Sequence, residues 1–304
     1  MTNAPLVTLG LLTYRRERHV REAVRSVLAQ TYSPLQIVIC DDASPDATAA
    51  IVDEELRAYR GPHKIVFYKG EQNQGIGNYN TLMKLAKGEL IVVAHDDDIS
   101  FPYRVERLAA AWRKSGASLV SSNSIVIAED GEELGLFSDP AAPTAITAED
   151  IAAKEWNMWL FGGGLAWERR VFDVFGPLDA NKSALITDWI LPFRASLLGG
   201  IAIVEEPLLL QRRHTDSKRA KLYGDHADKL ALGEIELANA LNQYYYMADT
   251  LEEARGKQLL PEARIAALRN TLLQSILTTG NNWRRVRNRL LAGGRRPRWL
   301  TPGQ

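Results

Sequence analysis

Short apolar runs alternate with amphipathic segments through the first 120 residues of the chain. Five runs have the length and β-branched content of strands, and they cover residues 7–13, 36–40, 65–68, 90–94 and 118–122. The segments between them repeat apolar residues at helical spacing, and they cover residues 18–30, 48–59, 76–86 and 102–114. Strands that alternate with helices predict an α/β fold with a doubly wound, mainly parallel sheet and helices on both faces.

The pattern changes twice further along the chain. Residues 123–215 are irregular, with a turn signal at Asp130-Gly131, a glycine-rich loop at 161–165, a helix at 186–198, and two short strands at 201–204 and 208–210. After residue 217 the periodicity predicts long helices, which cover residues 223–247, 261–279 and 283–291. The sequence therefore predicts a helical C-terminal extension.

Composition narrows the possible functions only slightly. Lysine plus arginine and aspartate plus glutamate both number 37 in 304 residues, so net charge gives no reason to expect a nucleic-acid partner. The single cysteine, Cys40, lies in an apolar run, which excludes an internal disulfide and fits a reducing compartment. The first residues show no basic-then-apolar signal pattern, and no apolar run reaches 18 residues. A cytoplasmic protein is the expectation.

Carboxylates gather where predicted strands end. Asp96, Asp97 and Asp98 follow the run at 90–94, Asp41-Asp42 follows the run at 36–40, and Asp188 begins a later helix. Clustered carboxylates repel one another unless a cation offsets the repulsion, and oxygen ligands suit Mg²⁺ or Mn²⁺. Loops after neighbouring strands of a doubly wound sheet share one crevice, so a common binding site is the favoured interpretation. Ordinary turns and helix caps explain each cluster taken alone.

Two further motifs carry weaker signals. The segment from Gly75 to Asn80 opens a helix and resembles a phosphate-cradling loop, but helix-capping glycines are the favoured interpretation. His214 follows two arginines and suits either a diphosphate or a metal shell, although a lone surface histidine remains the simpler interpretation.

Taken in order, these motifs resemble those of the inverting family 2 glycosyltransferases, which have the GT-A fold. The resemblance rests on Thr13-Tyr14-Arg15, on Ser26 to Tyr32, on Val38 to Asp46, on Asn73 to Asn80 with Ala86 to Glu89, on His95 to Pro102, on Trp167 to Asp179, and on Thr187 to Gly199. It covers about residues 5–217. It implies a catalytic domain at 1–217, with a nucleotide-sugar half at about 1–122 and an acceptor half at 123–217, followed by the helical extension at 218–304.

The resemblance also implies roles for matching positions. The residues expected to bind the nucleotide sugar are Thr13, Tyr14, Arg15, Glu17, Asp42, Asn73, Gly75, Asn80 and Asp96. Asp97 is expected to ligate the metal, with Asp98 and His214 as further contacts to the metal or the diphosphate. Asp188 is expected to be the general base. Three positions depart from the family pattern: His95 replaces the first signature aspartate, Arg15 replaces an asparagine, and Thr187 replaces a glutamate.

The implied reaction is metal-dependent transfer of a sugar, with inversion, from a nucleotide-diphosphate sugar to a hydroxyl acceptor. The expected cofactor is Mn²⁺ or Mg²⁺, the expected donor a UDP-sugar, and the expected acceptor a cell-surface glycan or lipid-linked saccharide. Two alternatives remain open. A sugar nucleotidyltransferase normally carries a glycine-rich loop after its first strand, where this chain has none, and a non-catalytic nucleotide-sugar-binding module would have no need of Asp188.

The end of the chain has an unusual charge pattern. Nine arginines and no acidic residue follow Glu262, and Trp283, Val286, Leu290 and Leu291 fall near one helical face. Amphipathic, arginine-rich segments of this kind suit an anionic membrane surface, which would make the protein peripheral on the inner face of a membrane. Packing on the catalytic domain or self-association through the C-terminal helices is the alternative.

Overall fold

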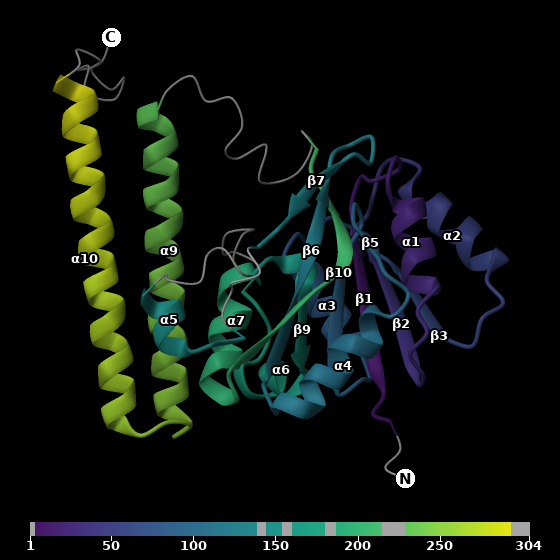
Figure 1. Cartoon of the computed structure of the whole chain (residues 1–304), viewed down its shortest axis with the longest axis horizontal. Helices are drawn as coiled ribbons and strands as arrows, with labels where there is room; N and C mark the ends of the chain where they lie inside the picture. Colours follow the sequence, from purple (N-terminus) through teal and green to yellow (C-terminus); the bar gives the residue numbers. More distant parts are fainter. Residues whose placement is uncertain (1–3, 139–143, 154–159, 180–186, 215–228, 293–304) are drawn as a thin grey trace. The chain divides into compact units, whose positions relative to one another are not determined.

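The computed structural model describes residues 4–138, 144–153, 160–179, 187–214 and 229–292 (Figure 1). By their internal contacts, residues 1–151 and 156–213 form one compact unit, and residues 152–155 and 214–304 form a second. Each unit is described separately below.

The first unit is built on one sheet that contains ten strands of the described residues. The strands are β1 (Val7–Thr13), β2 (Leu35–Asp41), β3 (Lys64–Lys69), β4 (Leu90–His95), β5 (Ile99–Ser100), β6 (Leu119–Ile127), β7 (Glu133–Leu136), β8 (Ala145–Ile146), β9 (Leu165–Glu168) and β10 (Ile201–Arg212). Their order is β3-β2-β1-β4-β9-β6-β10-β5, with β7 on β6 and β8 on β10. β3, β2, β1 and β4 are parallel, as are β6 and β10, whereas β9 runs antiparallel between β4 and β6. The predicted mainly parallel α/β sheet is confirmed.

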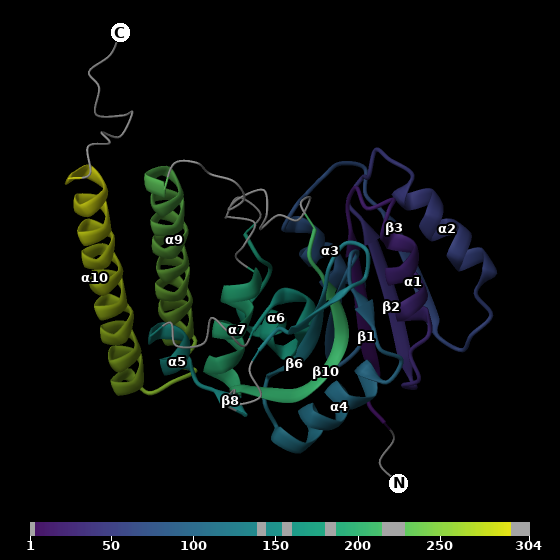
Figure 2. The same ribbon diagram turned by 45° about the horizontal axis from the view of Figure 1, so that its top comes forward.

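Helices cover both faces of this sheet (Figure 2). They are α1 (Val20–Leu28), α2 (Thr48–Ala58), α3 (Gly77–Leu85), α4 (Arg104–Ser115), the 3-10 turn η1 (Gly162–Gly164), α6 (Arg169–Phe175) and α7 (Thr187–Leu198). A further helix, α5 (Ala148–Ala153), follows β8 in the chain. Alternate residues of β1, including Leu9 and Leu11, pack with α1 and α4 in the main core. Gly10 points to the other face, where a Cβ atom would collide with Leu82 of α3. The period-two alternation of β1 therefore separates the two helical layers.

The region after β6 is more continuous than its sequence suggests. The two short strands expected at 201–204 and 208–210 form one strand, β10. Pro207 does not end the strand, because it lies where the pairing between β10 and β6 shifts register. The glycine-rich loop at 161–165 contains the turn η1 and leads into β9, which the sequence analysis did not predict. Isolated strands this short carry too little periodicity to be recognised.

The second unit contains the helices α9 (Lys229–Gly256) and α10 (Glu262–Ala292), which run antiparallel (Figure 1). Their buried seam includes Tyr244, Met247 and Leu251 of α9 and Leu268 and Leu272 of α10. The prediction of two separate helices at 261–279 and 283–291 was wrong, because α10 continues through Gly280. Within the described residues, no helix is both long and apolar enough to cross a membrane. Residues 293–304 of the arginine-rich tail lie outside the described residues.

One buried side chain joins the end of α1 to the loop that follows the carboxylate cluster. The Gln30 amide donates to the carbonyl oxygens of Ser26 and Phe101, at 3.0 Å and 2.9 Å, and its Oε1 accepts from the backbone N–H of Val105 at 3.1 Å. Gln30 is 4% exposed, so water cannot replace these partners.

Gln30→Ala should lower the free energy of unfolding by about 2–4 kcal/mol, because it leaves buried backbone groups without partners. Urea denaturation would measure the change. Gln72→Ala, at an exposed position, is the control and should change stability by less than about 0.5 kcal/mol. Equal effects of the two substitutions would contradict this account of Gln30.

Candidate active site

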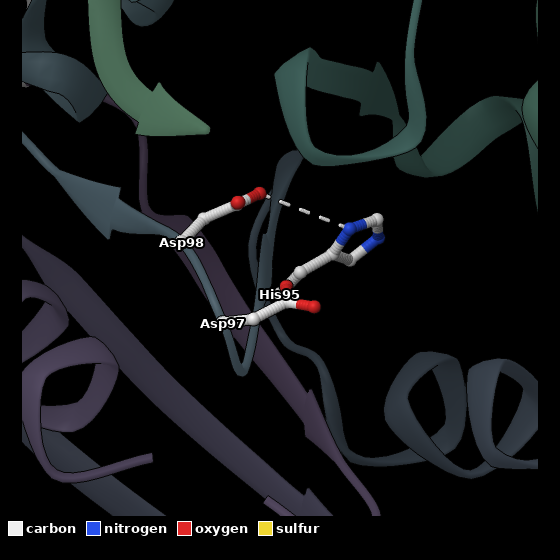
Figure 3. A group of neighbouring side chains, drawn as sticks. All are labelled: His95, Asp97 and Asp98. Atoms are coloured by element: carbon white, nitrogen blue, oxygen red, sulfur yellow. Dashed lines mark ion pairs between the residues drawn. The ribbon is translucent and has the colours of Figure 1, made fainter. Parts of the chain in front are cut away.

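Four consecutive polar side chains mark the end of β4. His95 is the last residue of the strand, and the turn that follows contains Asp96 and Asp98, both buried, and the half-buried Asp97. His95, Asp97 and Asp98 point toward one region, where each offers one ligand atom within 4.8 Å of the others (Figure 3). His95 Nδ1 lies 3.9 Å from Asp98 Oδ2. The turn therefore concentrates negative charge beside an imidazole.

Arg16 offsets part of this charge from the loop after β1. Its Nε lies 3.2 Å from Asp96 Oδ1 and 3.7 Å from Asp97 Oδ2. The backbone N–H of Tyr14 donates to the other oxygen of Asp96 at 2.9 Å. The β1 loop thus holds Asp96 from both of its oxygens.

Arg212 binds the same turn from the end of β10. Its backbone N–H donates to Asp98 Oδ1 at 3.0 Å, and its Nε donates to the carbonyl oxygen of Asp97 at 3.3 Å. The same guanidinium pairs with Glu22 of α1 at 2.8 Å. One arginine therefore connects β10, the carboxylate turn and α1.

Burial perturbs the acidity of these groups. Desolvation, followed by repulsion from Asp97, raises the pKa of Asp96 to about 7, against the opposing effects of Arg16 and the Tyr14 N–H. The same two causes raise the pKa of Asp98 well above its ordinary value. Burial lowers the pKa of Arg104 to about 10, although the neighbouring charge of Asp98 opposes this shift. A cation bound here would favour the ionised carboxylates.

Asp188, at the start of α7, lies against the turn η1. A Cβ atom on Gly162 would be 2.5 Å from Asp188 Oδ1 and 3.0 Å from His95 Cε1. The same small residue therefore touches both the carboxylate of α7 and the imidazole of β4. These are the predicted base and the first residue of the predicted metal signature.

The residues expected to bind the nucleobase and ribose surround the ends of β1 and β2. Thr13 is buried, Tyr14 is partly exposed, and Arg15 has a left-handed backbone with φ 55°, its N–H bonded to Ser44 Oγ. Glu17 Oε2 accepts from the N–H of Ala47 at 3.1 Å. Their contacts to a nucleotide stay predictions.

Two residues of that predicted set already hold other parts of the chain. The carboxylate of Asp42 accepts from the backbone N–H groups of Gln74 and Gly75, both at 2.8 Å. The Asn80 amide makes two 2.8 Å bonds to the backbone of Leu178. Both side chains therefore shape the loops around the site, whether or not they also contact a ligand. Asn73 is exposed, and its role stays a prediction.

His214 is buried, but it belongs to the second unit, so its expected contact with the metal or diphosphate stays a prediction.

The sequence analysis missed the cationic side of this site. Arg16 and Arg104 were not singled out, and Arg212 was noted only beside His214. One signal was present for Arg104, because it shares the buried face of α4 with Val105 and Leu108. Arginine is almost never fully buried unless it is paired, so its position on an apolar face implies buried partners.

Known proteins resemble this chain in sequence as well as in fold. The family model described as "Glycosyl transferase family 2" matches residues 8–175, which is more than half of the chain and runs from the second residue of β1 to the end of α6. The chain belongs to glycosyl transferase family 2. It is therefore a glycosyltransferase, and the alternative of a sugar nucleotidyltransferase has no support in the family match.

Curated relatives of this glycosyltransferase are distant and longer. An uncharacterised glycosyltransferase of Nostoc sp. is 26% identical over 211 residues, 68% of this chain and 65% of the relative. The succinoglycan biosynthesis protein ExoO of Rhizobium meliloti is 33% identical over 144 residues, 44% of this chain and 38% of the relative. The matched region therefore spans less than two thirds of either relative.

Solved structures share the fold at lower identity. Residues 1–349 of TarS from S. aureus, in complex with UDP-GlcNAc, give a TM-score of 0.56 at 16% identity, covering 92% of this chain and 91% of that one. The mannosyltransferase PcManGT from Pyrobaculum calidifontis, in complex with GDP-Man and Mn²⁺, gives a TM-score of 0.54 at 16% identity. That match covers 92% of this chain and 87% of PcManGT. These likenesses support the GT-A-type fold.

The raised pKa of Asp96 predicts how stability depends on pH. The Asp96 carboxyl has a pKa near 3.8 in the unfolded chain and about 7 in the folded protein. Below pH 3.8 it is protonated in both states, whereas between pH 3.8 and about 7 it is ionised only in the unfolded chain. Without divalent metal, the stability of the protein relative to Asp96→Asn should therefore fall as pH rises from about 4 to 7, by up to about 1.4 kcal/mol per pH unit.

Urea denaturation in EDTA across this pH range would test the slope. Asp46→Asn is the control: burial raises the pKa of Asp46, but hydrogen bonds from Thr48 outweigh it and the net shift is downward. Asp46 is therefore ionised in both states above about pH 5, so the stability difference between Asp46→Asn and the parent should stay flat from there to pH 7, and between pH 4 and 5 the parent should gain slightly as pH rises. A flat or rising difference for Asp96→Asn would contradict the assigned environment.

Proposed function

We propose that this glycosyltransferase moves a sugar from a nucleotide-diphosphate sugar to a hydroxyl acceptor, with inversion at the sugar carbon. In this proposal a divalent cation binds at the end of β4, and Asp188 is the general base. The observation that carries the proposal is the position of Gly162, which contacts His95 on one side and Asp188 on the other. A candidate metal cluster and a separate carboxylate thus border the same turn.

The residues at the end of β4 fit a divalent metal. Asp97, Asp98 and His95 supply two carboxylates and one imidazole, whose ligand atoms lie within 4.8 Å of one another. Side-chain rotations could bring ligand atoms this close together onto one cation. The two carboxylates suit Mg²⁺ or Mn²⁺, whereas the imidazole is a poorer ligand for Mg²⁺, which prefers oxygen. Bound there, the cation would offset the charge of the leaving diphosphate as a Lewis acid.

The chain's own groups would perform the remaining tasks. Asp188 would accept the proton of the acceptor hydroxyl, which is a weak nucleophile until a positioned base removes that proton. Asp96 would meet the ribose of the donor, and Arg16, which is paired with Asp96 and Asp97, would supply a positive charge beside the expected diphosphate. One metal cluster and one separate base suffice for a single displacement, which inverts the sugar carbon.

The relatives suggest classes of donor and acceptor. The two solved structures contain UDP-GlcNAc and GDP-Man, which supports a nucleotide-sugar donor here, and a UDP-sugar is the proposed one. The name of ExoO supports an acceptor in polysaccharide biosynthesis, either a growing glycan or a lipid-linked saccharide. Contact of the arginine-rich tail with the inner face of a membrane remains part of this proposal, with self-association as the alternative.

Asp97→Asn should lower activity at least about 10²-fold, because it removes a carboxylate ligand. Release of nucleoside diphosphate from a panel of UDP- and GDP-sugars would measure the rate. A thermal-shift titration with UDP and Mn²⁺ would measure metal-dependent binding, which should also be lost. Asp173→Asn makes the same chemical change at an exposed residue of α6 and should change neither. If Asp97→Asn kept near-normal turnover and required Mn²⁺ as the parent does, the assignment of Asp97 as a metal ligand would be wrong.

Asp188→Asn should abolish transfer to an acceptor while donor binding changes less than about threefold, because the base touches the acceptor and not the nucleotide. The comparison needs transfer rates and the affinity for UDP with Mn²⁺ on the same protein. Equal losses of rate and donor affinity would instead place Asp188 in the donor site.

A further inference from the structure

The turn η1 separates the proposed base from the proposed metal cluster, and it consists of three glycines. We infer that Gly162 is a positioning residue, which sets how closely the Asp188 carboxylate approaches His95 and the carboxylate turn of β4. This inference rests on the proposed function, because it assumes that Asp188 is the base.

Little space surrounds the first two glycines of the turn. A Cβ atom on Gly162 would lie 2.5 Å from Asp188 Oδ1, and one on Gly163 would lie 2.6 Å from Asp98 Oδ2 and 3.4 Å from His95 Nδ1. Successive residues of η1 therefore contact the base on one side and the metal cluster on the other. Any larger residue at either position must displace a carboxylate or the turn.

Backbone conformation does not explain these glycines. The positions with left-handed φ in the described chain include Gly75 and Gly116 but none of the three residues of η1. Alanine could therefore adopt the backbone angles of η1 without strain. These positions are glycine because neighbouring side chains come too close to leave room for a Cβ atom.

Arg104 keeps the turn from moving away. Its fully buried guanidinium donates to the carbonyl oxygen of Gly163, to the carbonyl oxygen of Val93 at 2.7 Å and to Ser100 Oγ at 2.9 Å. Val93 lies in β4, two residues before His95, so Arg104 ties η1 to the strand that carries the metal cluster. With the turn anchored to β4, a side chain on Gly162 would push against Asp188.

The consequence for catalysis follows from geometry. Misplacement of a reacting group by about 1 Å can cost about 10²-fold in rate. A methyl group on Gly162 should therefore lower kcat by one to two orders of magnitude, while KM for the donor changes less than about threefold.

A double-mutant experiment tests the contact without relying on activity. Gly162→Ala should lower the midpoint of thermal unfolding of the full chain by about 2–10 °C. In an Asp188→Ala background the colliding carboxylate is gone, so less than half of that loss should remain. Gly164→Ala is the matched control in the same turn, because its Cβ atom would meet the Phe161 ring and the Ser122 carbonyl oxygen. Its effect should be the same in both backgrounds.

Each outcome decides the inference. Equal losses for Gly162→Ala in the two backgrounds would overturn it, as would failure of Gly162→Ala to fold in both. If Gly162→Ala folds only in the Asp188→Ala background, the contact is supported. Thermal coupling together with a selective fall in kcat supports the positioning role. The positioning role of Gly162 would be overturned if the two substitutions were thermally coupled but Gly162→Ala had a normal kcat while Asp188→Asn was inactive.

Failure of the proposed function would give a different result. An active Asp188→Asn variant would remove the base assignment and leave Gly162 as a packing residue, even where the thermal coupling is observed.

Discussion

The structure depends on how a cluster of buried carboxylates is kept at the end of one strand. Asp96 and Asp98 are almost entirely buried beside Asp97, and charges so placed repel strongly when water is excluded. Three groups from distant parts of the chain offset that repulsion: the guanidinium of Arg16 after β1, the guanidinium of Arg104 in α4, and the backbone N–H of Arg212 at the end of β10. The strand order places β4 beside β1 and pairs β10 with β5, the strand that follows the turn, so the topology brings Arg16 and Arg212 to the carboxylates.

Features that depend on local sequence could be predicted, whereas contacts between distant residues, such as those that offset the carboxylate charge, could not. β1 and β4 follow from local periodicity, and the grouping of carboxylates at strand ends follows from a general rule for doubly wound sheets. The pairing of Arg212 with Asp98 joins residues 114 positions apart and leaves no local pattern. The same is true of β9, a four-residue strand whose place between β4 and β6 is fixed by its neighbours.

The residues implied by family resemblance divide into groups that face the site and groups that build it. Asp42 lies where a nucleobase contact is expected, yet both of its oxygens hold the backbone of the loop before α3. Asn80, one turn into α3, holds the backbone of Leu178 in the same way. Substituting either residue would move a loop as well as remove any ligand contact. A loss of donor binding on mutation is therefore weaker evidence of direct contact at these positions than at Asp97.

The replacement of the first signature aspartate by His95 fits the same electrostatic constraint. Gly162 borders both Asp188, the proposed base, and residue 95, so an aspartate at position 95 would place a further negative charge near the proposed base as well as near Asp98. Like charges disfavour ionisation of one another, and a base whose pKa is raised is less often free to accept a proton. An imidazole keeps a ligand atom in the cluster without adding negative charge. A histidine at position 95 is therefore compatible with a nearby base, the role proposed for Asp188, beside the three carboxylates of Asp96, Asp97 and Asp98. The identity of residue 95 matters because the glycine turn borders both groups.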